Sequence, residues 1–196
     1  MSVFRPVALA GALAFAAPAF AASYTLDAGH TRVGFAVTHM TVSTVRGEFT
    51  SVSGTVDYDP ANLAATKVSA KVGATSISTR DTDRDDHLRS PDFFDVAKYA
   101  DLSFVSTAVK NPTAQGFDLV GNLTIHGVTK EVTFHVKPFS PEVKDPWGNL
   151  KVGTSATTVI NRKDFGLVWN KQLDSGGYIV GDEVTIDLDV EMGRKP

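Results

Sequence analysis

The clearest pattern in the chain is an alternation of apolar and polar residues with a period of two. This period is typical of β-strands that bury one face. The segment 183–192 shows it best, because charged or threonine side chains separate five apolar residues, namely Val184, Ile186, Leu188, Val190 and Met192. The alternation recurs over 33–37, 68–74, 102–104, 117–125 and 132–136. We therefore expect about eight strands.

Short turn motifs separate these segments. They are Asp59-Pro60-Ala61-Asn62, Asn111-Pro112, His126-Gly127, Pro146-Trp147-Gly148 and Asp174-Ser175-Gly176-Gly177. Closely spaced strands with such turns predict an all-β domain, either a meandering antiparallel sandwich or a closed barrel. The apolar parity changes between Phe49 and Val52, which predicts a bulge near Thr50 or Ser51 that bends a long strand.

Two segments have helical features. Segment 81–96 contains Ser90 followed by Pro91, a good N-cap residue before a proline at the first helical position, and it leads into Phe93 and Phe94. Segment 161–165 is predicted to form a single capped turn. Helices at these places would plug or cover the end of a barrel.

The first 21 residues are expected to be a secretory signal peptide. Arg5 precedes an apolar run over 7–20, and Ala19-Phe20-Ala21 has the small-x-small form of a cleavage site. The run is shorter than the about 20 residues that a spanning helix needs, which disfavours the alternative of a retained anchor. We expect cleavage after Ala21 and a single soluble periplasmic domain over 22–196.

Composition narrows the partners and the sources of stability. The net charge is −3 and no basic run is present, so nucleic acid is not an expected partner. The chain has no cysteine, which excludes lipidation of a new N-terminus and leaves stability to the sheet and the core.

Motifs for catalysis or metal binding are not recognisable. There is no Gly-x-Ser-x-Gly elbow and no phosphate-binding glycine loop. Asp81, Asp83 and Asp85 imitate a calcium loop, but Asp86 stands where such a loop needs glycine. We therefore expect no catalytic residue, no metal and no cofactor.

Small residues on the inward parity suggest that the barrel interior is not full. They are Gly54, Ala70, Ala74, Gly121, Thr154 and Ala156. The interior of an eight-stranded barrel is either just filled by side chains or holds one small ligand. The pattern leaves both possibilities open, because the inward phenylalanines could also fill one another's space.

Five motifs, taken together, resemble those of the YceI-like family of periplasmic polyisoprenoid-binding proteins. The first two are YTLDAGHT at 24–31 and VGFAVTHM at 33–40, and the central one is DHLRSPDFFD at 86–95. The last two are GNLTIHGVT at 121–129 and NRKDFGL at 161–167. They follow the family's order along nearly the whole mature chain.

The resemblance implies a fold and a ligand. The implied fold is an eight-stranded antiparallel lipocalin-like barrel with short helical cap segments. The implied ligand is a long-chain isoprenoid lipid, such as a polyprenyl chain or an isoprenoid quinone, held in the lumen without catalysis. A transient inner-membrane partner and a homodimer are both compatible with this interpretation.

The predicted ligand-binding residues divide into an apolar lining and a polar pair. The lining comprises Val33, Phe35, Val37, Phe49, Phe94, Phe104, Leu123, Phe134 and Trp169. His39 and Arg162 are expected to contact the headgroup, whereas His30 is expected to bond to a turn, with Asp27 as its partner. The alternative is that Arg89, Arg162 and Asp164 form a structural ion pair, which would hold the helical segments to the barrel.

Two other functions stay open from sequence alone. One is an enzyme that acts on a quinone or lipid inside the barrel, and it would need acidic and basic groups that converge in the lumen. The other is a structural module without a ligand, in which bulky side chains would close the lumen.

Overall fold

The structure is a computed structural model that describes residues 21–174 and 176–196. The expected signal peptide lies outside these residues, apart from Ala21 at its predicted end. Among the described residues, no helix has the length and apolar character needed to cross a membrane.

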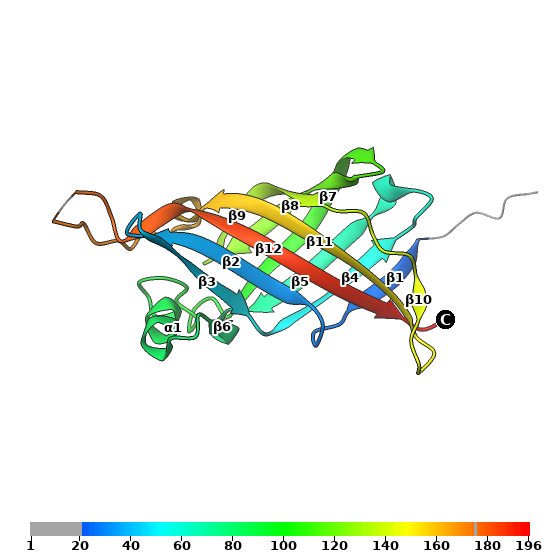
Figure 1. Cartoon of the computed structure of the whole chain (residues 1–196), viewed down its shortest axis with the longest axis horizontal. Coiled ribbons are helices and arrows are strands. Elements are labelled where there is room, and N and C mark those ends of the chain that lie inside the picture. Colours follow the sequence, from blue (N-terminus) through cyan, green and yellow to red (C-terminus); the bar gives the residue numbers. More distant parts are fainter. Residues whose placement is uncertain (1–20, 175) are drawn as a thin grey trace, which may run out of the picture.

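Within the described residues, the chain forms twelve strands, one α-helix and three short 3₁₀ helices (Figure 1). In chain order they are β1 (Ala22–Leu26), β2 (Arg32–His39), β3 (Ser43–Phe49), β4 (Val52–Tyr58), η1 (Leu63–Ala65), β5 (Lys67–Gly73), η2 (Ala74–Ser76), β6 (Ile77–Ser78), α1 (Thr82–Arg89), β7 (Asp101–Thr113), β8 (Gly116–Ile125), β9 (Val128–Val136), β10 (Val143–Lys144), β11 (Leu150–Asn161), η3 (Arg162–Phe165) and β12 (Val180–Arg194).

The strands close into an eight-stranded antiparallel barrel, which confirms the predicted fold class. Its ring runs β12–β1–β4–β5–β7–β8–β9–β11 and returns to β12. Pairing of β11 with β12 extends from Leu150↔Arg194 to Asn161↔Glu183, so these two strands form the longest continuous part of the wall. One edge of β12 is shared by two strands: β1 pairs with its end at 192–193, and β2 pairs with its earlier part at 180–189. β2, β3 and β6 therefore extend the wall toward one end of the barrel.

The bend predicted near Thr50 and Ser51 is present, but it is a break between two strands and not a bulge within one long strand. β3 ends at Phe49 and β4 begins at Val52, so both residues lie between the two strands. The backbone N–H of Ser51 donates to Ser76 Oγ at 3.0 Å, and Ser51 O accepts from Gly73 N at 3.0 Å. These bonds fix the bend, so that the apolar faces of both β3 and β4 point into the barrel.

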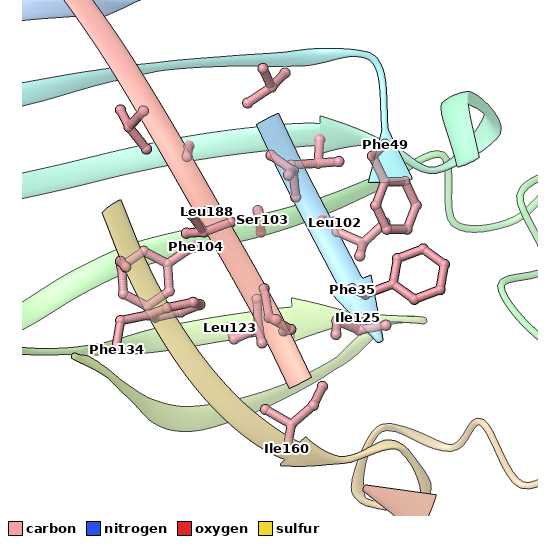
Figure 2. A pocket seen from close by; sticks show the side chains of 18 of the residues that line it. Phe35, Phe49, Leu102, Ser103, Phe104, Leu123, Ile125, Phe134, Ile160 and Leu188 are labelled. Atoms are coloured by element: carbon pink, nitrogen blue, oxygen red, sulfur yellow. The ribbon is translucent and has the colours of Figure 1, made fainter. Parts of the chain in front are cut away.

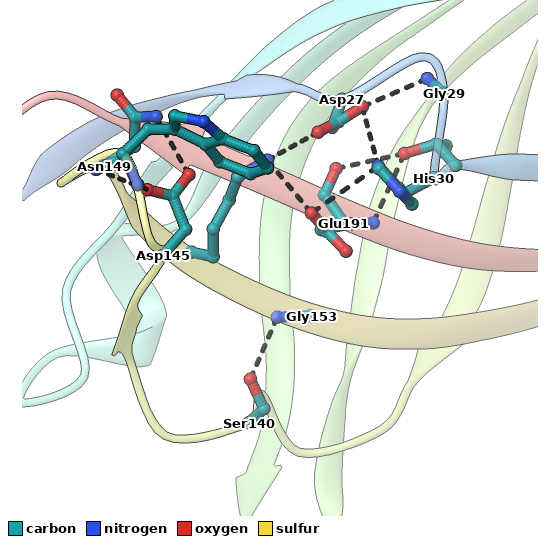
Figure 3. Close-up of polar contacts among 11 residues, drawn as sticks. Asp27, Gly29, His30, Ser140, Asp145, Asn149, Gly153 and Glu191 are labelled. Atoms are coloured by element: carbon teal, nitrogen blue, oxygen red, sulfur yellow. Dashed lines mark hydrogen bonds and ion pairs between the residues drawn. The ribbon is translucent and has the colours of Figure 1, made fainter.

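A second break, between β1 and β2, is held by a polar network on the outer wall (Figure 3). His30 Nδ1 lies 3.2 Å from Asp27 Oδ1, which confirms the expected turn contact. Lys151 Nζ lies 2.5 Å from Asp27 Oδ2 and 2.9 Å from Glu191 Oε1. Asp27, His30 and Glu191 bring their ligand atoms within 4.8 Å of one another, but the Lys151 ammonium already bridges both carboxylates.

The helix α1 confirms the helical part of segment 81–96 but corrects its start. Asp81 is the N-cap and accepts a bond from Arg84 N at 3.1 Å, whereas Ser90 is the C-cap. The prediction of a helix that begins at Ser90 and Pro91 is therefore wrong. The physical reason is that Ser90 O accepts from the N–H groups of Phe93 and Asp95, so this segment turns back instead of continuing as a helix.

The predicted turn at 161–165 is confirmed as η3. Asn161 caps it by accepting from Lys163 N at 2.9 Å, and Gly166 ends it in the left-handed region at φ 79°. Because only glycine adopts this conformation at little cost, Gly166 allows the chain to leave η3 toward the barrel end that α1 covers.

Candidate functional site

A cavity of about 250 Å³ lies inside the barrel, and its lining comes from strands all around the ring (Figure 2). Its lining is almost wholly aliphatic and aromatic, and Arg162 is its one ionisable side chain among the described residues. Several inward side chains, such as Val33 and Phe35, are only half-buried. Because their strand positions face inward, we attribute that exposed surface to the cavity.

The structure brings most of the predicted apolar lining together. Eight of the nine residues line the cavity, namely Val33, Phe35, Val37, Phe49, Phe94, Phe104, Leu123 and Phe134. Some of the aromatic rings contact each other: the centroids of Phe49 and Phe94 are 5.6 Å apart, and those of Phe104 and Phe134 are 5.2 Å apart. Their contact with a ligand stays a prediction.

Trp169, the ninth residue, lies outside this lining. Its ring packs against Phe93 at 5.2 Å and against His87 at 4.8 Å between centroids. His87 is fixed in turn, because its Nε2 lies 2.9 Å from Asp92 Oδ2. Since Phe93 lines the cavity, Trp169 covers the α1 end of the lumen from the outside.

The small residues have two different roles. Ala70, Thr154 and Ala156 line the cavity, as their parity predicts. The expectation that Gly121 leaves open space is wrong, because the Phe104 ring occupies that space. Among the other two expected residues, Gly54 lets the strand approach Ser69 O closely, and Ala74 is buried within η2.

The end of the lumen opposite α1 is closed by a compact apolar cluster. Its buried members are Tyr24, Val56, Tyr58, Val152 and Met192. The Tyr58 ring packs against Phe139 in a tilted arrangement, at 4.1 Å between ring centroids. Tyr24 donates its hydroxyl to Glu142 Oε2 at 2.5 Å, and burial raises the pKa of Tyr24 and of Tyr58. These groups therefore stay neutral at physiological pH.

Arg162 lies at the α1 end, 3% exposed, and holds backbone there. Its Nε donates to Gly181 O at 2.8 Å, and its Nη1 donates to Leu167 O at 2.5 Å and Trp169 O at 2.9 Å. Its Nη2 reaches Val180 O at 3.5 Å and Asp182 Oδ1 at 3.4 Å. Burial lowers the pKa of Arg162, and Asp182 opposes that shift.

A guanidinium has five N–H donors, so these contacts use them all. The predicted contact between Arg162 and a headgroup would require one of these bonds to be exchanged, and it stays a prediction. His39, the second predicted headgroup residue, lies half-buried at the end of β2 opposite Val180 and outside the cavity lining.

The alternative ion pair of Arg89 and Arg162 with Asp164 does not form among the described residues, because Arg162 pairs with Asp182 and Arg89 has other partners. The Arg89 guanidinium donates to Thr75 O at 3.0 Å and to Ile77 O at 2.7 Å, and it pairs with Asp86 at 2.9 Å. Arg89 therefore fastens α1 to the segment that carries η2 and β6.

Thr66 is a further residue of the lining, and no sequence motif marks it. It lies between η1 and β5, lines the cavity and is 5% exposed. Its Oγ1 is the buried side-chain polar atom without a hydrogen-bond partner within the described ranges. A usable signal was present, because Thr66 shares the inward parity of Val68, Ala70 and Val72.

The wall between β9 and β11 is weakly joined. Ala156↔Val136 and Thr157↔His135 are the paired positions, and Lys137 N donates to Ser155 O beside them at 2.9 Å. From Thr158 to Asn161 the strands separate around an outer groove of about 590 Å³. Ile160 lines both this groove and the lumen, and Phe165 lies buried beneath it.

Comparison with known proteins gives a consistent match. The family described as the YceI-like domain matches residues 24–192. A UPF0312 protein of Pseudomonas putida is 41% identical over 190 residues, which cover 96% of this chain and 95% of that protein. A UPF0312 protein of Pseudomonas fluorescens is 40% identical over 163 residues, covering 82% and 84% of the two chains.

Solved structures agree with the sequence match. BcnA of Burkholderia cenocepacia is similar with a TM-score of 0.72 and 25% identity, covering 85% of this chain and 98% of that chain. The Campylobacter jejuni YCEI protein is similar with a TM-score of 0.67 and 28% identity, covering 81% and 90%. A polyisoprenoid binding domain from Saccharophagus degradans shares the fold with a TM-score of 0.61 at 17% identity, covering 88% and 98%.

Proposed function

Because the chain belongs to the YceI-like domain family, we propose that it binds a long-chain isoprenoid lipid in the barrel lumen and stores or carries it in the periplasm. The observation that carries this proposal is the apolar cavity inside a closed barrel. The polyisoprenoid-binding neighbour resembles this chain in fold alone, so the proposal rests on the cavity and the family.

The energetics favour a long apolar guest. Each buried methylene contributes about 0.8 kcal/mol, so several isoprene units provide a large favourable term. Loss of translational and chain freedom offsets much of it. A polyprenyl chain or the tail of an isoprenoid quinone has the length and the apolar character that this lining suits.

The lining supports binding over catalysis. Acid–base chemistry requires titratable groups within hydrogen-bond reach of the reacting atoms. Arg162 is the one ionisable side chain of the lining among the described residues, and its donors are taken by backbone carbonyls and Asp182. An enzyme acting inside the barrel would lack an evident acid and base there.

The first experiment identifies the guest. The protein is expressed with its leader, recovered from the periplasm and measured by native mass spectrometry before and after organic extraction. We expect a mass increment that extraction removes and that matches an isoprenoid lipid. A protein that is recovered without lipid, and that takes up no prenyl lipid when offered one, contradicts the proposal.

A matched pair of variants tests where the guest lies. Ala156 lines the cavity, whereas its neighbour Thr157 is exposed on the outer face of β11. Ala156→Phe should fill the lumen and abolish lipid uptake, and Thr157→Phe should leave uptake unchanged. Circular dichroism should show an intact sheet in both variants. Equal uptake by the two variants would place the lipid outside the lumen.

A further inference from the structure

The polar side chains that line the lumen differ in whether they have a hydrogen-bond partner within the protein, and this difference bears on how a guest is oriented. The Thr66 hydroxyl has no hydrogen-bond partner although the residue is 5% exposed and lines the cavity. Its own backbone N–H is bonded to Leu63 O at 3.0 Å, so the unmet capacity belongs to the side chain alone. An unpaired buried hydroxyl is unfavourable in an apolar site.

Three of the other four polar residues of the lining have partners for their side chains, and the fourth, Ser103, occupies an outward strand position. Thr154 Oγ1 donates to Lys137 O at 2.8 Å, and Thr31 Oγ1 donates to Glu191 O at 3.0 Å. Ser103 alternates with the inward side chains of Leu102 and Phe104, so its strand position belongs to the outer face. Arg162 uses its donors on backbone and on Asp182, as described above.

Thr66 lies at the end of the lumen opposite α1. Leu63 and Val68 pack against the closed cluster of Tyr24 and Tyr58 as well as against the main core. The pairs Val56↔Val68 and Asp57↔Lys67 place Thr66 beside Tyr58. In Figure 1 the cyan connection between β4 and β5 lies at the other end of the barrel from α1. Thr66 Oγ1 itself has less than 1 Å² of accessible surface, so a group that bonds to it must lie deep in the lumen, and the side chain must turn toward that group.

We propose that the Thr66 hydroxyl forms a hydrogen bond with a neutral oxygen of the guest, so that the oxygen-bearing end of the lipid lies at the closed end of the barrel. This inference rests on the proposed function and specifies the ligand class. A ketone, a quinone or an alcohol suits the site, because each can pair with one hydroxyl. A phosphate does not, because an ionised group would be buried there without a cation.

The test compares two lipids and four proteins. The lipids are a polyprenyl methyl ketone and the hydrocarbon of equal chain length. The proteins are the parent chain, Thr66→Val, Thr66→Ser and Thr154→Val. Thr154→Val is the matched control, because it removes a hydroxyl from the same lining that already has a protein partner. Affinity for each lipid is measured by titration after delipidation.

We expect Thr66→Val to lose about 10-fold in affinity for the ketone while its affinity for the hydrocarbon stays within about twofold. Thr66→Ser should keep the preference for the ketone, and Thr154→Val should change both affinities by a similar factor. The infrared carbonyl band of the bound ketone should lie at lower frequency in the parent chain than in Thr66→Val. Urea unfolding should show Thr66→Val to be at least as stable as the parent chain.

Other outcomes separate the two proposals. An unchanged ratio of affinities in Thr66→Val would mean that the hydroxyl holds only a water molecule, and the inference is then overturned. Binding of the hydrocarbon but not the ketone by the parent chain also overturns it and leaves the lipid-binding function standing. Failure of the parent chain to bind either lipid contradicts the proposed function itself.

Discussion

The Phe104 ring lies against Gly121 of the neighbouring strand, and a Cβ atom at position 121 would stand 2.4 Å from Phe104 Cζ. The same relationship joins Phe35 to Gly47, where the corresponding distance is also 2.4 Å. Both rings face the lumen. The two glycines therefore provide space at the wall for rings that would otherwise project further into the cavity.

Gly121→Ala should push the Phe104 ring toward the lumen. Overpacking of this kind costs about 1–3 kcal/mol, so the free energy of unfolding in urea should fall by that amount. Gly153→Ala is the control, because its Cβ would meet nothing nearer than Val190 O at 3.4 Å. Phe104→Leu should relieve part of the loss, and a strictly additive double mutant would contradict the account.

Acid should weaken the network between β1 and β12. The bond from Lys151 lowers the pKa of Asp27 from 3.8 to about 2 in the folded protein. The ionised carboxylate therefore stabilises the fold fully above about pH 4, and this contribution of about 1 kcal/mol disappears as the pH falls through 2. Lys151→Met should remove it, so the stability difference between parent and variant should shrink from pH 5 to pH 2. A difference that is constant with pH would show that Asp27 is not the group responsible.

Arg162→Lys should destabilise the α1 end despite the retained charge. A lysine has three donors on one atom and cannot reach carbonyls that lie in the directions of Leu167, Trp169 and Gly181. Buried carbonyls left without partners should lower the free energy of unfolding by about 3 kcal/mol. Hydrogen exchange should accelerate over 166–170. Lys163→Arg, on the exposed neighbour, should stay within about 0.5 kcal/mol of the parent chain, and equal stability of both variants would disprove the anchoring role.

Trp169→Ala should speed the release of a bound lipid. The opposite end of the lumen is closed by the Tyr24 and Tyr58 cluster, so we expect the guest to leave past α1. Loss of the aromatic contacts to Phe93 and His87 weakens that cover by about 1 kcal/mol, which should raise the release rate several-fold. Trp147→Ala, at a side chain that is 84% exposed on the β10–β11 turn, is the control. Equal release rates for the two variants would place the exit elsewhere.

Much of the fold was predictable because strand periodicity is a local property. The alternation over 183–192 appears as β12, and the parity change after Phe49 marks a real bend. The ends of α1 were not predictable in the same way. Both Asp81 and Ser90 are good cap residues, and the choice between them depends on where Phe93 and Phe94 can reach the lumen, which is a tertiary contact.

The site was predictable in its apolar part and less so in its polar part. Parity alone places Phe35 and Leu123 in the lining, since side chains alternate across a strand. The bonding of Arg162 depends on carbonyls of segments that are distant in sequence, such as Gly181. The missing partner of Thr66 likewise depends on what surrounds it in three dimensions, so no local pattern reveals it.

The sparse pairing of β9 with β11 has a consequence for what the barrel can hold. Longer ladders of hydrogen bonds join β4 to β5, β7 to β8, β8 to β9 and β11 to β12, but past Thr157 the strands β9 and β11 are free of that constraint. Ile160 is the side chain that touches both the lumen and the outside groove there. We therefore expect this seam to yield before the rest of the wall, because a shift of Ile160 would widen the lumen there without the loss of a strand pair.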